Sequence, residues 1–479
     1  MITGTSDNVC YVKLPIETRD RGLSPFFPWF SPVFRRSAAI SPPAENPSRR
    51  IEIVLAVLAV AVPLATWFAW PRLPALGSLP QSQANPGSIY PASQLPFQKQ
   101  SPGPPIEIPP RISHVQIVDL DGDSKPELLA CDALAQRLIS YRRGSNDTWT
   151  EHPISVPMAA PAHATVVDID GDGDLDILVA ILGNAFPDDS QVGRVLLLER
   201  NGDHYDRHVL LNGTRRIADI QAGDLDGDGD LDLAVAEFGY ARGRVLWLEN
   251  IGQRRFRDHQ LLYAPGTINV PLADLDGDGD LDIAANVSQD DEEIWAFENR
   301  GGGRFQKRLL HKWLNFDIGG SGMITSDLDN DGDVDLLVTV GDNLEYAYTY
   351  PQPYHGCFWF RNDGDWSFKV HRISSLGGTH AASVSDLDSD GDNDVILVSM
   401  FNAWYRDDTA SLVWLENDGQ QQFTPQQIAS SPTHLVTVAT GDINGDGKPD
   451  IAAGGWHVIP PFRRLGGVTT WLNRGGDRK

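Results

Sequence analysis

The chain has 479 residues, 41% of them hydrophobic, with 65 acidic and 39 basic residues and a formal net charge of -26. This balance excludes nucleic acid as a partner, because a phosphate backbone is bound by a basic surface. The 45 glycines and 33 prolines favour many short strands joined by turns over a disordered chain. Cys10, Cys131 and Cys357 form no C-x-x-C pair, which excludes a zinc ribbon, c-type haem attachment and a disulfide scaffold. We expect free buried thiols at Cys131 and Cys357, with one bridge between them as the alternative.

Residues 51–70 form an apolar stretch, IEIVLAVLAVAVPLATWFAW, in which Glu52 is the single charge. Its length suits about 30 Å of hydrocarbon, and we expect a transmembrane signal anchor there. Arginines lie mainly before it, so the positive-inside rule places a disordered tail, residues 1–50, in the cytoplasm. A linker rich in Pro and Ser would follow at 71–95, with the remaining chain in the periplasm or outside the cell. The alternative is a cleaved signal peptide and a secreted protein.

One nine-residue pattern recurs seven times in the rest of the chain, at intervals of 49 to 59 residues. The copies are DLDGDSKPE from Asp119, DIDGDGDLD from Asp168, DLDGDGDLD from Asp224 and Asp274, DLDNDGDVD from Asp327, DLDSDGDND from Asp386 and DINGDGKPD from Asp442. An apolar stretch precedes each copy, and a strand pattern such as ILVA follows it. A second signature, of the type VLWLENIG, comes about 15–30 residues later and leads into a strand that begins with an aromatic residue.

Four strands per repeat predict one blade of a β-propeller, and seven repeats predict seven blades. The domain would cover residues 96–479 in an all-β fold. The last repeat ends after its third strand, at TTWLNRGG. Phe97 begins FQK, as Phe305 does, and each lies 22 residues before the next acidic loop. We therefore expect residues near 96–101, within a segment reaching residue 108, to supply the missing outer strand and close the ring.

Each acidic loop carries oxygen-bearing side chains at positions 1, 3, 5 and 9, and position 7 can offer its backbone carbonyl. Hard oxygen donors in a flexible loop suit Ca²⁺, and the seven loops could hold up to seven structural calcium ions. A single Asp-Gly run would be read as a turn, but seven in one register would repel themselves without a cation. The predicted ligands are Asp119, Asp121, Asp123 and Glu127; Asp168, Asp170, Asp172 and Asp176; Asp224, Asp226, Asp228 and Asp232; Asp274, Asp276, Asp278 and Asp282; Asp327, Asp329, Asp331 and Asp335; Asp386, Asp388, Asp390 and Asp394; Asp442, Asn444, Asp446 and Asp450.

These repeats resemble FG-GAP/VCBS repeats, the blades of the integrin alpha-chain propeller and of many bacterial surface proteins. The resemblance covers about residues 96–479 and is closer to the bacterial VCBS type, because no clear pair of FG-GAP tripeptides is present. It implies that each D-x-D-x-D-G-x-x-D loop joins the first two strands of a blade and binds calcium. It also implies that all the loops lie on one face and that ligands bind on the other.

The opposite face would be formed by the segments that lead into the first strands and by the loops between second and third strands. His, carboxylate and aromatic side chains gather in these segments, as they do at sites that stack sugars, bind a further metal or move protons. The candidate ligand-binding residues are His114, His163, Asp219, Glu237, Asn269, His380, Trp404, Tyr405, His434, Trp456 and His457. The alternative is that these histidines and aromatics are packing groups of the blades.

The sequence therefore predicts a membrane-anchored, calcium-binding propeller that acts as a binding or adhesion module for a protein or glycan. No catalytic residue is assigned, and no motif for nucleotide binding or hydrolysis occurs in the chain. The alternative function is a periplasmic carbohydrate lyase or dehydratase, because some fungal aldos-2-ulose dehydratases and rhamnogalacturonan lyases are similar in using calcium-bearing propellers on sugars.

Overall fold

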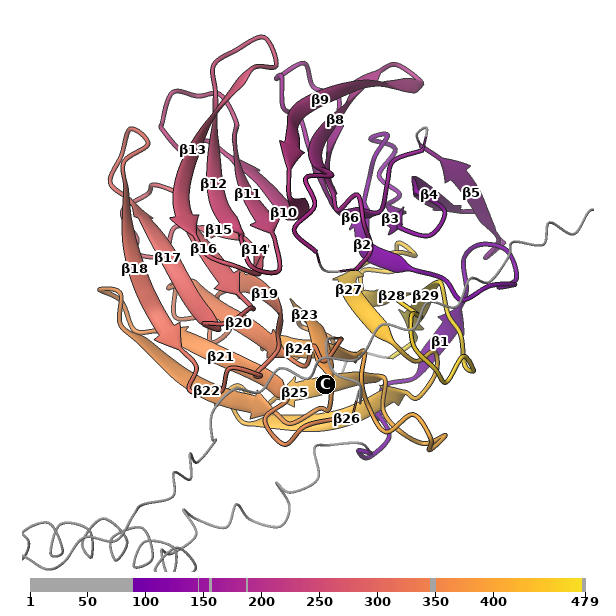
Figure 1. Cartoon of the computed structure of the whole chain (residues 1–479). Helices are drawn as coiled ribbons and strands as arrows, with labels where there is room; N and C mark the ends of the chain where they lie inside the picture. Colours follow the sequence, from indigo (N-terminus) through magenta and orange to yellow (C-terminus); the bar gives the residue numbers. More distant parts are fainter. Residues whose placement is uncertain (1–88, 145, 155–156, 187, 345–349, 476–479) are drawn as a thin grey trace, which may run out of the picture. The chain divides into compact units, whose positions relative to one another are not determined.

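The computed structural model describes residues 89–475, apart from 145, 155–156, 187 and 345–349, as a ring of seven antiparallel sheets (Figure 1). The all-β propeller with seven four-stranded blades is therefore confirmed. The transmembrane segment predicted at 51–70 lies outside the described residues. Within the part of the chain that is described, no helix has the length and apolar character to cross a membrane. Cys131 and Cys357 are both free and buried, as expected.

In six blades all strands come from one continuous stretch of chain. In the seventh blade the outer strand comes from the N-terminal side of the described chain. Blade 1 contains β2 (Ile112–Val118), β3 (Glu127–Asp132), β4 (Arg137–Arg143) and β5 (Trp149–Pro153). Blade 2 contains β6 (Pro161–Val167), β7 (Asp176–Ile181), β8 (Gly193–Asn201) and β9 (His204–Thr214). Blade 3 contains β10 (Arg216–Gly223), β11 (Asp232–Phe238), β12 (Arg244–Asn250) and β13 (Phe256–Tyr263).

In blade 4 the innermost position is divided between two short strands that both pair with β16. Its strands are β14 (Thr267–Asn269), β15 (Leu272–Ala273), β16 (Asp282–Val287), β17 (Glu293–Asn299) and β18 (Phe305–Lys312). Blade 5 contains β19 (Gly320–Ser326), β20 (Asp335–Val340), β21 (Gly356–Asn362) and β22 (Phe368–Ser374). Blade 6 contains β23 (Thr379–Ser385), β24 (Asp394–Ser399), β25 (Leu412–Asn417) and β26 (Phe423–Ala429). Blade 7 contains β27 (Leu435–Gly441), β28 (Asp450–Gly455), β29 (Val468–Asn473) and β1 (Phe97–Gln100).

The second strand of each blade is an apolar run because it is covered on both faces by neighbouring blades. In β7, Ile177 packs in a cluster with Leu129 and Leu138 of blade 1, whereas the next residue, Leu178, packs with Val235 of blade 3. Successive side chains of a strand point to opposite faces, so a continuous apolar sequence fills two interfaces at once. Each fully buried aliphatic side chain stabilises the ring by about 1.5–3 kcal/mol.

The ring is closed by β1, which pairs antiparallel with β29 and sets Phe97 opposite Asn473 (Figure 1). The same register recurs in blade 4, where Phe305 lies opposite Asn299, so Phe97 holds the place that its match with Phe305 predicts. Residues 89–95, which the sequence analysis assigns to the linker, lie against blade 6. There the backbone N–H of Gln427 donates to the Pro91 carbonyl, and Ala92 bridges to Gln427 in parallel. The part of the chain held by the propeller therefore begins before residue 96.

Proline substitutions can test this closure, because only alternate backbone N–H groups of β1 face β29. The N–H of Arg474 donates to the Pro96 carbonyl, so the alternation directs the N–H of Gln98 toward β29 and that of Lys99 away from it. We expect Gln98→Pro to destabilise the protein by about 1–3 kcal/mol and Lys99→Pro to cost much less. Urea unfolding measures both, with Gln98→Ala correcting for the lost side-chain bond to Arg474. Equal effects of the two prolines would contradict the closure.

Candidate metal centres and ligand face

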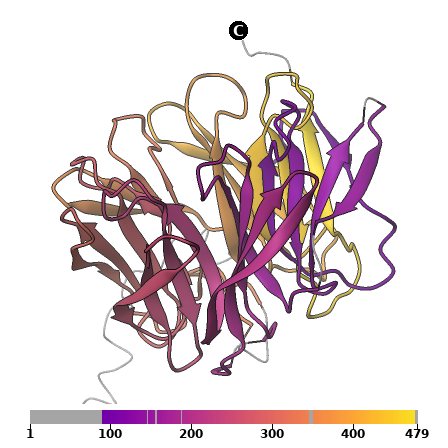
Figure 2. The ribbon, with the colours of Figure 1, turned by 90° about the horizontal axis from the view of Figure 1, so that it is seen from above.

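All seven acidic loops occupy the same place in their blades, between the first strand and the second. Each blade is an up-and-down meander, and the first strands of neighbouring blades contact one another around the ring. The loops therefore share one face of the ring with the turns between third and fourth strands. The loops between second and third strands, and the segments that connect blades, lie on the opposite face. Figure 2 shows the ring from its side, with loops at both faces.

The loop that begins at Asp274 shows how the chain wraps its own carboxylates. Asp274 Oδ1 accepts the backbone N–H groups of Gly277 at 2.8 Å and Asp278 at 3.2 Å, and its Oδ2 accepts the N–H of Gly279 at 2.9 Å. Asp278 Oδ1 accepts the N–H of Asp280 at 2.9 Å. Gly279 has a φ of 95°, a conformation that favours glycine, which explains the glycine at position 6. These turns direct several carboxylates to one side of the loop.

Acidic oxygens within these loops converge closely enough to share a cation. In each of five loops, three carboxylates offer oxygen atoms that all lie within 4.8 Å of one another. Two oxygens on opposite sides of a calcium ion would be about 4.6–5.2 Å apart, since Ca–O distances are 2.3–2.6 Å. The groups are Asp119, Asp121 and Glu127; Asp168, Asp170 and Asp176; Asp224, Asp226 and Asp228; Asp274, Asp276 and Asp282; and Asp327, Asp329 and Asp335.

In the first and seventh loops a side-chain donor already contacts a predicted ligand carboxylate, as in the fourth loop, where the Trp366 Nε1–H donates to Asp276 Oδ2 at 3.1 Å. In the first loop the Arg142 guanidinium pairs with Asp121 at 2.8 Å and with Glu127 at 3.4 Å. In the seventh loop the Asn444 side-chain N–H donates to Asp450 Oδ2 at 2.8 Å. A protein cation or donor thus partly satisfies these two carboxylate sets. In the sixth loop, Asp386 accepts the N–H groups of Asp390 and Gly391 as in the other loops.

The carboxylate at position 9 is the most buried member of each set. Burial raises the pKa of Asp282 and Asp394 to about 7, and the negative charge of the position-3 carboxylate adds to the effect. Burial likewise raises the pKa of Asp232, Asp335 and Asp450 to about 6. The pKa values of Glu127 and Asp176 are also raised by burial. Ionising these buried carboxylic acids costs free energy, and the charge of a bound cation would offset that cost.

In several blades the second sequence signature, of the type WLEN, binds the loop of its own blade to that of the preceding blade. In blades 3 and 6 the side-chain amides of Asn250 and Asn417 donate within their own blade instead. In blade 5 the backbone N–H of Asn362 donates to Asp335 Oδ1 at 2.7 Å, while its side-chain Nδ2 donates to the Leu275 carbonyl at 2.8 Å in the loop of blade 4. Its Oδ1 accepts the N–H of Gly364 at 3.1 Å. Asn299 and Asn473 contact Leu225 and Leu387 in the same way, and in blade 2 the guanidinium of Arg200 reaches the Leu120 carbonyl.

Several candidate ligand residues of the opposite face link neighbouring blades instead. His114 Nδ1 accepts the backbone N–H of Ala164 at 3.4 Å, and Asp219 Oδ2 accepts that of Val270 at 2.9 Å. His380 Nδ1 lies 2.9 Å from the Val436 carbonyl, to which it can donate. Each belongs to a first strand, where a register shift occurs at a similar place in every blade, as between Ile217 and Asp219. For these three side chains the geometry favours the packing alternative.

Other candidates are buried away from the central channel. Glu237 is fully buried and is paired with the guanidinium groups of Arg215 and Arg244. His434 and His457 are buried with ring centroids 5.1 Å apart. Burial lowers the pKa of His434 to about 3 and that of His457 to about 4, so both are neutral near pH 7. Trp404 is buried beside His434, whereas Tyr405 is 72% exposed.

A cavity of about 730 Å³ follows the axis of the ring and is lined by the first strands of all seven blades. His163 and Asp219 meet in it, with His163 Nδ1 at 3.2 Å from Asp219 Oδ1, and the His114 ring lies 4.0 Å from the His163 ring. The remaining candidates that line the cavity are Asn269, His380 and Trp456. The structure thus brings six of the eleven candidates to one cavity and leaves Glu237, Trp404, Tyr405, His434 and His457 outside its lining.

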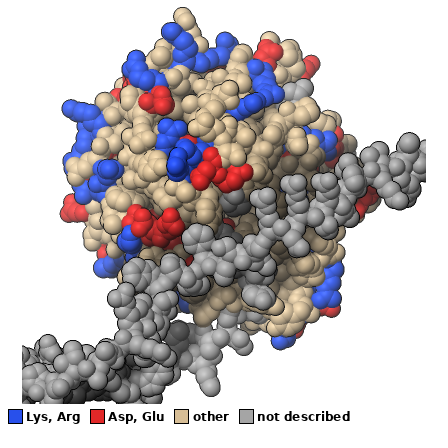
Figure 3. Space-filling view, viewed as in Figure 1, with Lys and Arg blue, Asp and Glu red and all other residues tan. Residues whose placement is uncertain are grey.

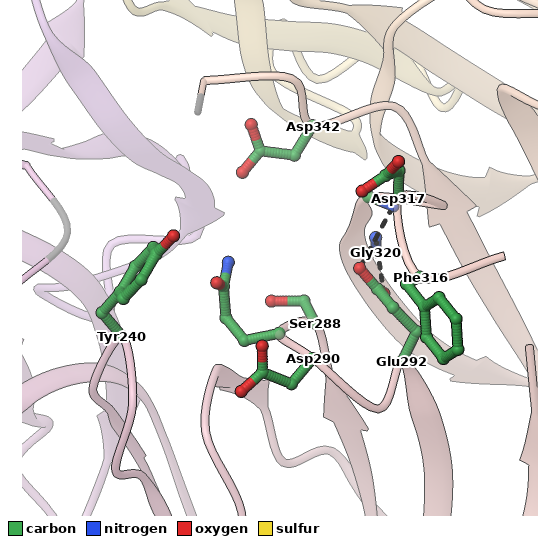
Figure 4. A pocket seen from close by; sticks show the side chains of 10 residues that line it. Tyr240, Ser288, Asp290, Glu292, Phe316, Asp317, Gly320 and Asp342 are labelled. Carbon is green, nitrogen blue, oxygen red and sulfur yellow. Dashed lines mark hydrogen bonds between the residues drawn. The ribbon is translucent and has the colours of Figure 1, made fainter. Parts of the chain in front are cut away.

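A second cavity, of about 450 Å³, opens on the face opposite the acidic loops, and the sequence analysis did not single it out. It is a crevice formed by the β11–β12, β16–β17 and β20–β21 loops and by the segment that leads into β19. Figure 4 shows Tyr240 and Phe316 on opposite sides of this crevice, with Ser288 and Asp290 between them and Asp342 across from them. Single aromatic or acidic residues in loops carry no periodic signal, so only their convergence in space identifies the crevice.

The fold and the loops together define the class of this protein. It is a seven-bladed propeller with an acidic, oxygen-rich loop in every blade. The family model described as FG-GAP-like repeat matches residues 119–179, 224–285, 274–338 and 386–453, about half of the chain. The chain therefore belongs to the FG-GAP-like repeat proteins. No curated protein matches it.

Two solved structures to which the chain is similar are distant in sequence. A selenomethionine-substituted virginiamycin B lyase from Staphylococcus aureus is 13% identical with a TM-score of 0.48, over 79% of this chain and 99% of that one. The structure of BBS1N in complex with ARL6DN is 11% identical with a TM-score of 0.48, over 80% of this chain and 98% of that one. Likenesses at this level say nothing about what the present chain binds or catalyses.

Substituting the asparagine of the second signature tests the bond between blades. We expect Asn362→Ala to destabilise the protein by about 2–4 kcal/mol, because it leaves the buried Leu275 and Val334 carbonyls without this donor. The control is Asn201→Ala in blade 2, where Arg200 holds the equivalent place and the Asn201 side chain contacts only Asp206 on the surface. Thermal unfolding of both variants measures the difference. A loss as small for Asn362→Ala as for Asn201→Ala would contradict the role of the bond.

Proposed function

We propose that the protein is a calcium-stabilised binding module that presents its propeller outside the cytoplasm. The convergence of three carboxylates in each of several loops carries the calcium part of this proposal. The donors are oxygen atoms only, and calcium accepts six to eight of them in irregular geometry. The side chains at positions 1, 3, 5 and 9 and the carbonyl at position 7 would hold the ion. Bound calcium would supply the positive charge that lets the position-9 carboxylates ionise.

Calcium would act on the whole ring rather than on isolated loops. Asp335 belongs to the loop of blade 5, and Asn362, whose backbone N–H it accepts, reaches the loop of blade 4. Holding a loop in place would therefore also hold its neighbour. We expect weaker binding at the first and seventh loops, since Arg142 and Asn444 already contact their carboxylates. The ion has a structural part in this proposal and no catalytic one.

Removing calcium should lower the melting temperature sharply. Each calcium site that exists only in the folded chain stabilises the fold by about 2.7 kcal/mol at a calcium concentration one hundred times the Kd of that site. Calorimetry in calcium and in excess EGTA measures the melting temperature. An unchanged melting temperature in EGTA would rule out the calcium assignment.

Within one loop, Asp226→Asn should weaken one site in calcium titrations, because Asp226 is one of the three converging carboxylates. Asp230→Asn at position 7 serves as the control, since lysine occupies that position in the first and seventh loops.

The face opposite the loops is the proposed binding face for a protein or a glycan. Support comes from the axial cavity and from the crevice beside it. Catalysis by a lyase or dehydratase has weaker support. The His163–Asp219 pair lies in the axial cavity, but the Asp219 carboxylate already accepts the backbone N–H groups of Ile220 and Val270.

The anchor is proposed on the apolar stretch 51–70 and on the arginines that precede it. We expect the full chain to sediment with membranes and to resist extraction by high salt. A variant that lacks residues 51–70 should instead remain in the cytoplasm, and protease added outside the cytoplasm should reach the propeller only in the full chain. A mature chain found shortened to a start beyond residue 70 would favour the cleaved signal peptide.

A further inference from the structure

We infer that Trp366 is a positioning residue for the metal site of the fourth acidic loop, which begins at Asp274. Its indole N–H, donated from blade 5, holds the Asp276 carboxylate in place for a cation bound in blade 4. This inference rests on the calcium part of the proposed function, because it names a residue outside the loop that determines how strongly one of the sites binds.

The contact joins two blades through residues that lie 90 positions apart in the chain. Trp366 Nε1–H donates to Asp276 Oδ2 at 3.1 Å, and Asp276 Oδ1 accepts the backbone N–H of Asp278 at 3.3 Å. Both oxygens of the carboxylate are therefore held before an ion arrives. An ionised carboxylate offers about four lone-pair positions, so acceptor positions remain for a cation.

The indole differs in charge from Arg142, the side chain that contacts the same ligand position in the first loop. Arg142 brings a positive charge to Asp121 and Glu127, and that charge competes with a cation. The indole is neutral, so it can orient a carboxylate without repelling the ion. Hydrogen bonds that orient a ligand from outside the ligand set raise metal affinity, and losing one typically weakens binding by about 10–100-fold.

The third loop provides a natural comparison, because its nine residues have the same sequence as those of the fourth, DLDGDGDLD. In the fourth loop the position-3 carboxylate converges with those at positions 1 and 9, whereas in the third loop it converges with those at positions 1 and 5. This difference cannot come from the sequence of the loop, so residues outside it contribute. Among the described residues, the donor to the Asp226 carboxylate of the third loop is the backbone N–H of Asp228, and no side chain donates to it.

The residue of blade 4 equivalent to Trp366 is Gly303. Each lies four residues after the asparagine that donates to the preceding loop, Asn299 in blade 4 and Asn362 in blade 5. Gly303 offers no side chain, and a Cβ atom there would lie 2.2 Å from the Trp247 ring. In blade 5, Asn362 and Trp366 donate to two consecutive residues of the fourth loop. The fourth loop is therefore held by a side-chain donor that the third loop lacks.

The backbone of Trp366 supports a role beyond packing. Its φ is 59°, close to the 65° of Gly303, in the left-handed region that costs free energy for a bulky side chain. Residues held in such conformations cluster at functional sites, where their surroundings compensate the cost. Here the compensating contacts are the bond to Asp276 and the guanidinium of Arg308 in β18, which lies 4.8 Å from the centre of the indole ring. Both contacts are with blade 4, so the ring is fixed against that blade.

Calcium-dependent stability, measured on the full chain in detergent, tests the effect at this site. Figure 3 shows acidic side chains in several places on the surface, so weak binding of calcium outside the loops is expected as a background. The quantity to compare is the gain in unfolding free energy between excess EGTA and saturating calcium, from which changes in packing cancel. We expect Trp366→Phe, which keeps an aromatic ring without the N–H, to weaken the fourth site about tenfold and so to reduce this gain by about 1.4 kcal/mol.

Combined variants identify the loop through which the indole acts. Trp366→Phe should reduce the calcium-dependent gain in an Asp226→Asn background, which alters the third loop, but not in an Asp276→Asn background. Trp295→Phe is the matched control, because its indole N–H donates to Glu293 at 2.8 Å, outside the acidic loop of the same blade. We expect Trp295→Phe to leave the gain unchanged.

A spectroscopic measurement tests the contact without removing the indole. Fluorotryptophan incorporated into the chain gives a fluorine resonance for each of the 13 tryptophans, and the resonance missing from Trp366→Phe belongs to Trp366. We expect calcium to shift this resonance in the otherwise unaltered chain but not in Asp276→Asn. If Trp366→Phe did not fold, the resonance would still be recognised as one that calcium shifts in the unaltered chain alone.

An undiminished gain in Trp366→Phe would overturn the inference, and so would an equal loss in the Asp276→Asn background, because the indole would then act through packing alone. The absence of any resonance that needs Asp276 for its calcium shift would also overturn it. In each of these cases the calcium proposal would stand, since the unaltered chain would still be stabilised by calcium. Equal melting temperatures of the unaltered chain in calcium and in EGTA would instead reject the calcium proposal and this inference with it.

Discussion

The carboxylate at position 9 of each acidic loop is the group on which the rest of the ring depends. Asp335 accepts the N–H of Leu328 in its own loop and that of Asn362 in the third strand, so it joins the loop to its blade. Asn362 then reaches the Leu275 carbonyl in the loop before it. Asn299 and Asn473 make the same bond, so these bonds join several neighbouring loops on one face of the ring. A polar group buried so deeply must stay bonded, because leaving it unpaired is costly.

The acidity of the chain follows from these acidic loops more than from any partner. The odd positions of the seven loops hold about half of the 65 acidic residues, and they are gathered where their mutual repulsion is greatest. Burial raises the pKa of several of them into the neutral range, as for Asp282 and Asp394 at about 7. A divalent cation would remove both the repulsion and the cost of ionisation. The net charge of -26 is therefore explained mainly by the candidate metal ligands of the acidic loops.

The opposite face is built by the parts of the repeat that vary. Side chains at the recurring register shift of the first strands, such as His114, Asp219 and His380, are used to join blades. Tyr240 and Phe316 belong to no repeated pattern, and they stand exposed at the crevice. In a repeat protein, residues at the periodic positions pack neighbouring repeats together. Positions that break the period are free to carry recognition, and they are the ones a repeat-based reading passes over.

The sequence by itself determined the number of blades, the loops that carry the carboxylates and the strand that closes the ring. These features repeat or match residue by residue, as Phe97 matches Phe305, and local pattern is sufficient to see them. It could not decide which histidines face a cavity and which join blades, because that depends on the neighbouring blade and not on the residues beside them in the chain. The sequence could not predict the crevice for the same reason. Its lining comes from four separate segments, which contribute Tyr240, Asp290, Phe316 and Asp342. Only closure of the ring brings these segments together.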